Sequence, residues 1–447
     1  MNFPLKLLTI ATFILVAMPQ ANFPYGPAPI YAIDLLLIGA CYYGGLRRFK
    51  KFGRIPHSGF VICILTFALL SEFLSMFFLG SYIESIYMTG RLCVSVSVFF
   101  LVNNLIRSEA DLLPIIKAAV AGMLVTAFLM AMTSLPGTRN LVAWVFGIEL
   151  LTPSGDRFFK ANETISRGIR GQSLVGYNII SAWFVALIWP LAIALYKHPQ
   201  TIGLWRRIAQ IACFLGPFGV IFSYSRGAIL GLLLIITALL IFGEGRLKTQ
   251  ISIAIIFVVT IITFFGWDSD LFYFERIERR TRATIENPFA SEMESERFYS
   301  YIDPFIIVSD NPMVTLWGEG LTVERLRERA GRNIETIISK KNRNVADHSV
   351  FSKATLSYGM LAAFCYLGLW ASSTLRAYAE ARISTKNQGL ERYFPQLVFA
   401  SVFGLSAWIA FDKGIIIQPR GAMMFFLITG LVGVCQNLRI NRQARNR

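Results

Sequence analysis

Apolar residues in this chain are gathered into about twelve blocks, most of them about 16 to 24 residues long. A helix of roughly 20 residues crosses the hydrocarbon core of a bilayer, so blocks of this length predict membrane-spanning helices. Amphipathic helices of a large soluble protein would carry polar residues every few positions, and many of these blocks carry almost none. We therefore expect an all-α polytopic membrane protein. Its predicted spans are residues 5–18, 30–45, 59–79, 86–106, 113–133, 177–196, 208–222, 228–242, 251–267, 350–375, 395–411 and 422–436.

Basic residues between the blocks predict the orientation of the chain. They gather after the second, sixth, eighth, tenth and twelfth predicted spans, which are all even-numbered. Short loops rich in Lys and Arg stay on the cytoplasmic side of a membrane, so we expect both termini to be cytoplasmic. The residues concerned are Arg47, Arg48, Lys50, Lys51, Arg54, Lys197, Arg206, Arg207, Arg246, Lys248, Arg376, Arg382, Lys386, Arg392, Arg439, Arg442, Arg445 and Arg447.

Two segments on the predicted outer side, residues 134–176 and 268–347, are too long to be simple connectors. In the second, Ser291 and Glu294 have the spacing of a capping box, which predicts a helix through Arg297. The predicted organisation is N-terminal transmembrane helices (1–133), central helices with the first long periplasmic loop (134–267), a large helical periplasmic loop (268–349), and C-terminal helices with a cytoplasmic tail (350–447).

Composition agrees with a membrane location. Only 16% of the residues are charged, whereas about a quarter is usual in soluble domains. The net charge of +16 would suggest nucleic acid in a soluble protein, but basic cytoplasmic loops account for it here, and we expect no nucleic-acid partner. All six cysteines lie in apolar blocks without metal-type spacing, so neither a disulfide framework nor a zinc site is predicted. Residues 1–18 are interpreted as a retained first span rather than a cleaved signal peptide.

His348 is the one histidine expected on the outer side, where the large loop enters the tenth predicted span. A neutral imidazole can accept a proton from a hydroxyl or donate a hydrogen bond to a phosphate oxygen. The alternative is that Asp347 caps the following helix and His348 simply occupies its first turn.

Three arginines are candidates for binding a phosphate. Arg226 lies at the turn between the seventh and eighth predicted spans, where its planar fork can reach a phosphate or where it simply anchors a span end. Arg167 and Arg170 precede the sixth predicted span beside glycines, which permit close approach of a ligand but also occur in ordinary loops.

Several classes of chemistry leave no trace in the sequence. There is no Walker-type phosphate loop, no nucleotide-binding glycine motif and no cluster of metal ligands. Charges within the predicted spans are few, and Glu72 is the clearest of them. A proton-coupled or ion-coupled transporter usually needs more.

Four short motifs resemble the O-antigen ligase and O-antigen polymerase family of bacterial envelope enzymes, over about residues 167–369. They are Arg170 before Gly171 and Asn178; Ser223-Tyr-Ser-Arg-Gly-Ala228; Arg297 followed by Asn311-Pro312 and Trp317-Gly-Glu-Gly320; and Asp347-His348-Ser349 followed after nine residues by Gly359-Met-Leu-Ala362. The resemblance implies a GT-C-like helical bundle in the bacterial inner membrane, with its active site on the periplasmic face.

The resemblance also implies an activity, which is a metal-independent glycosyl transfer without a cofactor. The donor is a glycan on undecaprenyl diphosphate, and the acceptor is a sugar hydroxyl on lipid A-core for a ligase or on another lipid-linked repeat for a polymerase. Such enzymes serve lipopolysaccharide or exopolysaccharide synthesis. The resemblance implies that Arg226 and Arg170 bind the diphosphate and that His348 is the base or orienting donor. Arg167, Arg297 and Glu319 are lesser candidates.

Two other classes of protein stay open. A transporter or lipid-linked glycan flippase also commonly has about a dozen spans, although the single large outer loop and the scarcity of charges within the spans argue against it. A non-catalytic envelope assembly factor is the third possibility, and its outer surface would tolerate substitution of all the arginines named. Ligase and polymerase share these motifs, so the sequence does not separate them.

Overall fold

A computed structural model describes residues 2–18, 22–23, 30–44, 55–79, 82–135, 137–146, 173–174, 178–223, 225–242, 248–249, 252, 316–322, 349–384 and 390–445, and all structural statements below concern these residues. The described secondary-structure elements are helices apart from one short antiparallel pairing, between β1 (Asn22–Phe23) and β2 (Ile30–Tyr31). The helices are α1 (Phe3–Ala17), α2 (Ala32–Gly44), α3 (Ser58–Leu79), α4 (Tyr82–Leu105), α5 (Glu109–Ser134), α6 (Arg139–Phe146), α7 (Asn178–Lys197), α8 (Leu204–Phe222), α9 (Arg226–Phe242), α15 (Val350–Tyr358), α16 (Met360–Ser384), α17 (Leu390–Phe411), α18 (Gly414–Ile417) and α19 (Pro419–Arg445).

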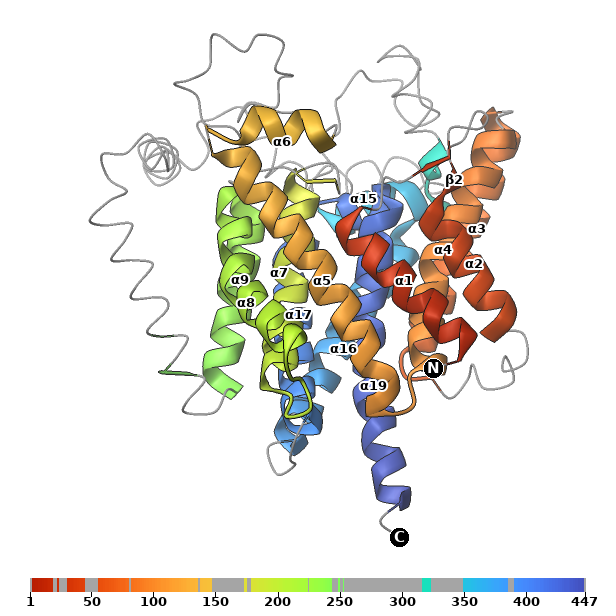
Figure 1. The fold of residues 1–447 in the computed structure, drawn as a ribbon. Helices are drawn as coiled ribbons and strands as arrows, with labels where there is room; N and C mark the ends of the chain where they lie inside the picture. The colour runs from red at the N-terminus through yellow and green to blue at the C-terminus, as the bar shows by residue number, and fades with distance from the viewer. Residues whose placement is uncertain are drawn as a thin grey trace, which may run out of the picture.

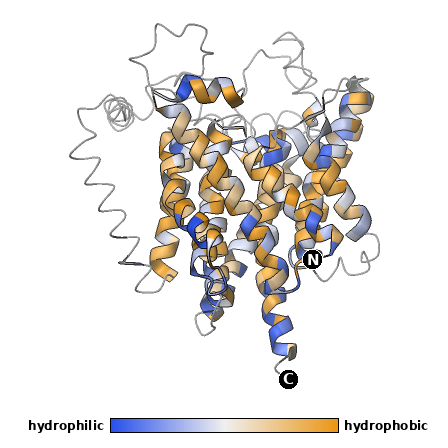
Figure 2. Cartoon of the chain, viewed as in Figure 1, coloured by the Kyte–Doolittle hydropathy of each residue, from blue (hydrophilic) through white to orange (hydrophobic). Residues whose placement is uncertain are grey.

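The long helices lie side by side in one bundle (Figure 1). α17 contacts α7, α9, α16 and α19, while α5 joins α1, α7 and α8. Apolar residues cover the length of the bundle, and hydrophilic residues gather toward helix ends such as the final turns of α19 (Figure 2). The helix α15 lies at the opposite end of the bundle from the two chain termini (Figure 1). We call these two ends the α15 end and the terminal end.

The predicted all-α fold is confirmed, but the predicted number of spans is confirmed only in part. Six described helices are long and apolar enough to cross a membrane: α3, α4, α5, α7, α17 and α19. Three predicted spans correspond to the shorter apolar helices α1, α2 and α9. The seventh corresponds to α8, and the ninth, residues 251–267, lies outside the described residues except for residue 252. The predicted helix through Arg297 also lies outside them.

The tenth predicted span is wrong as one continuous helix, because the chain breaks it at Gly359. α15 ends at Tyr358, Gly359 has a φ of +87°, and α16 begins at Met360. The sequence around the break stays apolar, so hydropathy alone does not reveal it. A left-handed φ interrupts the helical hydrogen-bond pattern and is readily adopted only by glycine.

Helix α6 is an element that the apolar pattern did not predict. It crosses the α15 end of the bundle (Figure 1) and packs Val142 against Leu129 of α5. Trp144 is 82% exposed, and Leu141, Val145 and Phe146 are exposed beside it. A short helix that exposes Trp and aliphatic residues across a bundle end is typical of the headgroup level of a membrane.

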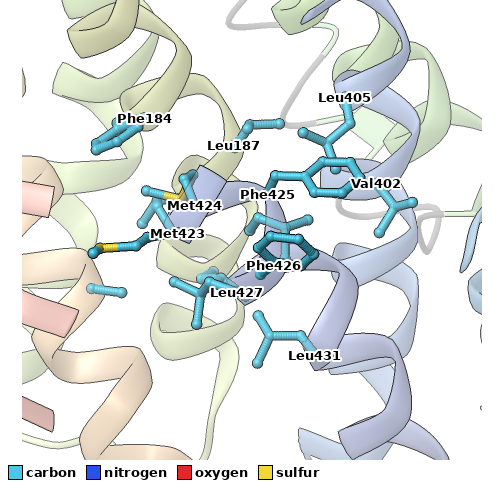
Figure 3. Close-up of a cluster of buried hydrophobic side chains, with 14 of the residues drawn as sticks. Phe184, Leu187, Val402, Leu405, Met423, Met424, Phe425, Phe426, Leu427 and Leu431 are labelled. Carbon is cyan, nitrogen blue, oxygen red and sulfur yellow. The ribbon is translucent and has the colours of Figure 1, made fainter. Parts of the chain in front are cut away.

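The packed centre of the bundle joins α7, α17 and α19. Phe184 and Leu187 of α7 meet Val402 and Leu405 of α17 and a run of side chains from Met423 to Leu431 of α19 (Figure 3). Nearby, the indoles of Trp183 and Trp408 stack with centroids 5.5 Å apart and an interplanar angle of 8°. These contacts fix the relative positions of the helices whose ends reach the α15 end.

A buried ion pair joins α16 to α19. Arg439 donates from Nε and Nη2 to the two carboxylate oxygens of Glu380, at 2.9 and 3.0 Å. Glu380 is only 3% exposed, and Arg376 Nε lies 3.6 Å from the same carboxylate. Bidentate geometry of this kind gives the strongest charge-assisted hydrogen bonds.

Replacing Arg439 by Met is expected to lower the free energy of unfolding by about 3 kcal/mol, because it leaves a buried carboxylate without its main partner. Thermal unfolding of the purified protein in detergent measures the change. Arg376→Met is the matched control, since Arg376 is more exposed and more distant. Equal losses for the two variants would contradict a dominant Arg439–Glu380 pair.

Candidate active site

Two of the six predicted site residues, Arg226 and Glu319, lie within the described residues. His348, Arg170, Arg167 and Arg297 lie outside them. The described neighbours of these residues still define the local frame: Ser349 follows His348 directly, and residues 316–322 and 349–359 belong to two of the motifs.

Arg226 is the first residue of α9, and the residues around it explain its motif. The Ser225 N–H donates to Ser223 Oγ at 3.0 Å, and the Ala228 N–H donates to Ser225 Oγ at 3.4 Å, so the two serines close the turn. A Cβ on Gly227 would lie 3.2 Å from the ring of Trp183 and 3.6 Å from Phe411 Cβ. Glycine therefore lets the turn sit against α7 and α17, while the Arg226 side chain is exposed.

Helix α15 does not begin with Asp347 as its cap. Its N-cap is Ser349, whose Oγ accepts from the Ser352 N–H at 3.0 Å and lies 2.8 Å from Ser352 Oγ. Ser349 is 1% exposed. His348 is the residue before this cap in the sequence, so the alternative that Asp347 caps the helix is wrong.

The Trp317-Gly-Glu-Gly320 motif packs against the C-terminal end of α15. Backbone N–H groups of Glu319 and Gly320 donate to the carbonyls of Leu356 and Ser357, both at 2.8 Å. We call residues 316–322 the Gly-x-Gly loop. Gly318 and Gly320 have φ angles of +71° and +81°, a region that other L-residues rarely adopt.

The Gly-x-Gly loop and the break after α15 fit together without room for side chains. A Cβ on Gly318 would lie 2.4 Å from the backbone of Ser357, and a Cβ on Gly359 would lie 2.2 Å from the carbonyl oxygen of Leu316. Two motifs that are separate in the sequence thus meet backbone to backbone. Glu319 takes part in this junction through its main chain.

Gly359→Ala is expected to destabilise the protein by about 1–3 kcal/mol from backbone strain alone, with a further cost from the clash with Leu316. The measurement is the thermal unfolding midpoint in detergent, together with the amount of protein recovered in membranes. Gly90→Ala is the matched control, because Gly90 lies within α4 and a Cβ there would meet no described atom outside that helix within 4 Å. A Gly359→Ala protein as stable as Gly90→Ala would show that the junction tolerates a side chain.

The Arg226 turn and the start of α15 lie at the same end of the bundle. The turn approaches Phe411, the last residue of α17, and α15 contacts both α17 and α18.

Asp412 follows Phe411, and its Oδ1 accepts from the Gly414 N–H at 2.6 Å. Burial raises the pKa of the Asp412 carboxyl, and this hydrogen bond opposes the rise. The sequence did not single out Asp412, because one acid after an apolar block looks like an ordinary loop residue.

Further basic residues at this end were also missed. Lys353 of α15 is only 5% exposed. Arg91 of α4 and Arg420 of α19 place their guanidinium carbons 4.3 and 5.2 Å from the centroid of the Tyr31 ring. Each of these residues lies inside or beside an apolar block, and only the fold brings Arg91 and Arg420 to the same ring. Within the described residues no group of three or more His, Cys, Asp or Glu gathers as metal ligands would.

Comparison with known families supports the resemblance that the motifs carry. No curated protein matches the chain at a significant level. A family model described as O-antigen ligase matches residues 211–367, a segment that contains the Arg226 turn, the Gly-x-Gly loop and α15. Members of that family are glycosyl-transfer enzymes, either ligases or polymerases. Residues 211–367 are therefore similar to the O-antigen ligase family, in agreement with the motifs that lie within them.

Proposed function

We propose that this protein transfers a glycan from undecaprenyl diphosphate to an acceptor sugar hydroxyl at the periplasmic face of the bacterial inner membrane, as an O-antigen ligase does. One observation carries the proposal. The O-antigen ligase match includes both the Arg226 turn and α15, and both lie against α17, the turn at its last residue, Phe411. The Arg226 turn and the helix that follows His348 in the sequence therefore belong to the same end of one bundle.

The chemistry balances without a metal ion or cofactor. The acceptor hydroxyl oxygen attacks the anomeric carbon of the donor, a carbon–oxygen bond forms, and the bond from that carbon to the diphosphate oxygen breaks. The electron pair leaves with undecaprenyl diphosphate, and the hydroxyl proton passes to the imidazole of His348. Because a diphosphate is already an adequate leaving group, the enzyme chiefly has to stabilise its growing charge and orient the hydroxyl.

In this proposal the guanidinium groups of Arg226 and Arg170 bind the diphosphate. Arg226 suits this role because its side chain is exposed at a turn whose backbone is held by two serines, and a guanidinium presents paired donors to phosphate oxygens. Arg167 and Arg297 are assigned to substrate binding, and this assignment rests only on the sequence motifs. Glu319 is assigned to holding the Gly-x-Gly loop, on the hydrogen bond of its backbone N–H to Leu356.

The periplasmic assignment rests on two observations. Helix α6 exposes Trp144 and its apolar neighbours across the α15 end, which fits the headgroup level of one leaflet. The basic loops that predict the cytoplasmic side include the final turns of α19, at the terminal end. The proposed site then faces the compartment into which lipid-linked glycans are delivered.

Deletion of the gene in its native bacterium tests the proposal and separates its two forms. For a ligase we expect full-length glycan to accumulate on the lipid carrier, with lipid A-core left uncapped. For the alternative, a polymerase of the same family, we expect single repeats on lipid A-core, or loss of secreted polymer in an exopolysaccharide system. An unchanged surface glycan with no lipid-linked intermediate would refute both.

A further inference from the structure

Glu72 is a buried carboxylate in the second half of α3, and its contacts lie far away in the sequence. It is 1% exposed. Its Oε1 accepts from the Leu321 N–H, and its Oε2 accepts from the Thr322 hydroxyl, both at 2.6 Å. Among the described residues no Lys or Arg nitrogen forms an ion pair with it. Both oxygens are therefore used to hold the Gly-x-Gly loop.

Two further hydrogen bonds, from α4 and from α3, support the Gly-x-Gly loop and the end of α15. Ser85 Oγ of α4 donates to Thr322 Oγ1 at 3.2 Å, so α4 supports the threonine that donates to Glu72. Ser71, the residue before Glu72, donates from Oγ to the carbonyl of Ser357 at 2.5 Å. That carbonyl also accepts from the Gly320 N–H. Consecutive residues of α3 thus hold the loop and the end of α15 together.

Helix α15 runs from its N-cap Ser349, the residue after His348 in the sequence, to this junction with the Gly-x-Gly loop. It has nine residues, which at 1.5 Å per residue is a length of about 13 Å. A tilt of about 5° at the junction would move the other end by about 1 Å, and a misplacement of that size can cost about 100-fold in rate. The orientation of α15 therefore governs where a residue immediately before its N-cap can place its side chain.

We propose that Glu72 is a positioning residue for the transfer reaction: by holding Leu321 and Thr322 against α3, it sets the orientation of α15 and thereby the position of His348. The inference rests on the proposed function. It gives the N-terminal helices a role, since α3 and α4 hold the loop on which α15 rests. Glu72 itself touches neither substrate nor leaving group.

The test measures initial rates of glycan transfer by the full-length protein in vesicles, as a function of the concentration of undecaprenyl-diphosphate-linked glycan. Glu72→Leu removes both acceptors and leaves the Leu321 N–H and the Thr322 hydroxyl without them. We expect kcat to fall about 100-fold while KM for the donor changes less than about threefold. Glu72→Gln is expected to stay within about fivefold of the wild type, because its amide oxygen accepts from Leu321 and its NH2 group can donate to Thr322.

Thr322→Val and Ser75→Ala complete the set. Thr322→Val removes one of the two bonds to Glu72 and should lower kcat about tenfold; it carries the test if Glu72→Leu does not fold. Ser75 lies one turn further along α3 and is buried, and its Oγ has no hydrogen-bond partner among the described residues. Ser75→Ala is therefore the matched control and should retain the wild-type kcat.

Three results would overturn the inference: a wild-type kcat in both Glu72→Leu and Thr322→Val, a change confined to KM, or a loss that merely follows the folded fraction measured by thermal unfolding. Failure of the proposed function looks different, because the wild-type protein would then transfer no glycan under any condition. A working wild type with unaffected Glu72 and Thr322 variants removes this inference alone.

Discussion

Replacing Arg226 by alanine is expected to lower the rate of glycan transfer by about 100-fold to 1,000-fold, the range seen when one preorganised donor to a developing negative charge is lost. Arg226 has an exposed side chain at the first position of α9, beside the end of α17. Arg226→Lys keeps the charge but not the planar fork, so we expect a smaller loss, about tenfold. The measurement is transfer from lipid-linked glycan by protein of matched membrane levels.

The control for Arg226 is Arg207→Ala, the same change at an exposed arginine near the start of α8. We expect Arg207→Ala to transfer glycan at the wild-type rate. Full activity in Arg226→Ala would favour the alternative that Arg226 only anchors the end of a span. Equal losses at the two positions would indicate an effect of total positive charge rather than of the turn.

Replacing His348 by alanine is expected to lower kcat by about 100-fold to 10,000-fold, which is the usual contribution of a general base. The KM for the donor should change little, because in the proposed reaction the imidazole acts on the acceptor hydroxyl. Steady-state rates at saturating acceptor separate the two constants. His57→Asn is the matched control: His57 lies just before α3 with a φ of +64°, a conformation that asparagine tolerates.

Undiminished transfer in His348→Ala would remove His348 from the mechanism. It would also remove the reason for a precisely oriented α15, so the Glu72 variants would then be expected to affect stability only. A loss in His57→Asn equal to that in His348→Ala would point instead to a general sensitivity of the protein to substitution.

The sequence predicted the bounds of a helix well where the helix is one continuous apolar run. Helix α3 begins at Ser58 and ends at Leu79, against a prediction of residues 59–79. Ends set by polar caps were missed: α5 starts at Glu109 because Ser108 and Asp111 form a capping box, whereas hydropathy suggested residue 113. The break at Gly359 was missed because its cause is the approach of Leu316, which is 43 positions away in the chain.

The candidate site was predictable in its motifs but not in its contacts. Motif order singled out Gly318, Gly320 and Gly359, yet only the fold shows that their missing side chains let two backbones touch. Glu72 was noticed as an unusual charge within a predicted span, and its partners Leu321 and Thr322 are about 250 residues further along. Pairwise contacts over such separations cannot be read from one sequence, because residue type gives no register between distant segments.

The most direct test of the central claim uses the purified protein in vesicles, supplied with a radiolabelled glycan on undecaprenyl diphosphate and an acceptor with a free sugar hydroxyl. The account predicts a covalently enlarged acceptor and one equivalent of released undecaprenyl diphosphate, both formed at least about 100-fold more slowly in the Arg226→Ala and His348→Ala proteins. Movement of labelled lipid across the bilayer without any covalent product would contradict it and would instead indicate a flippase.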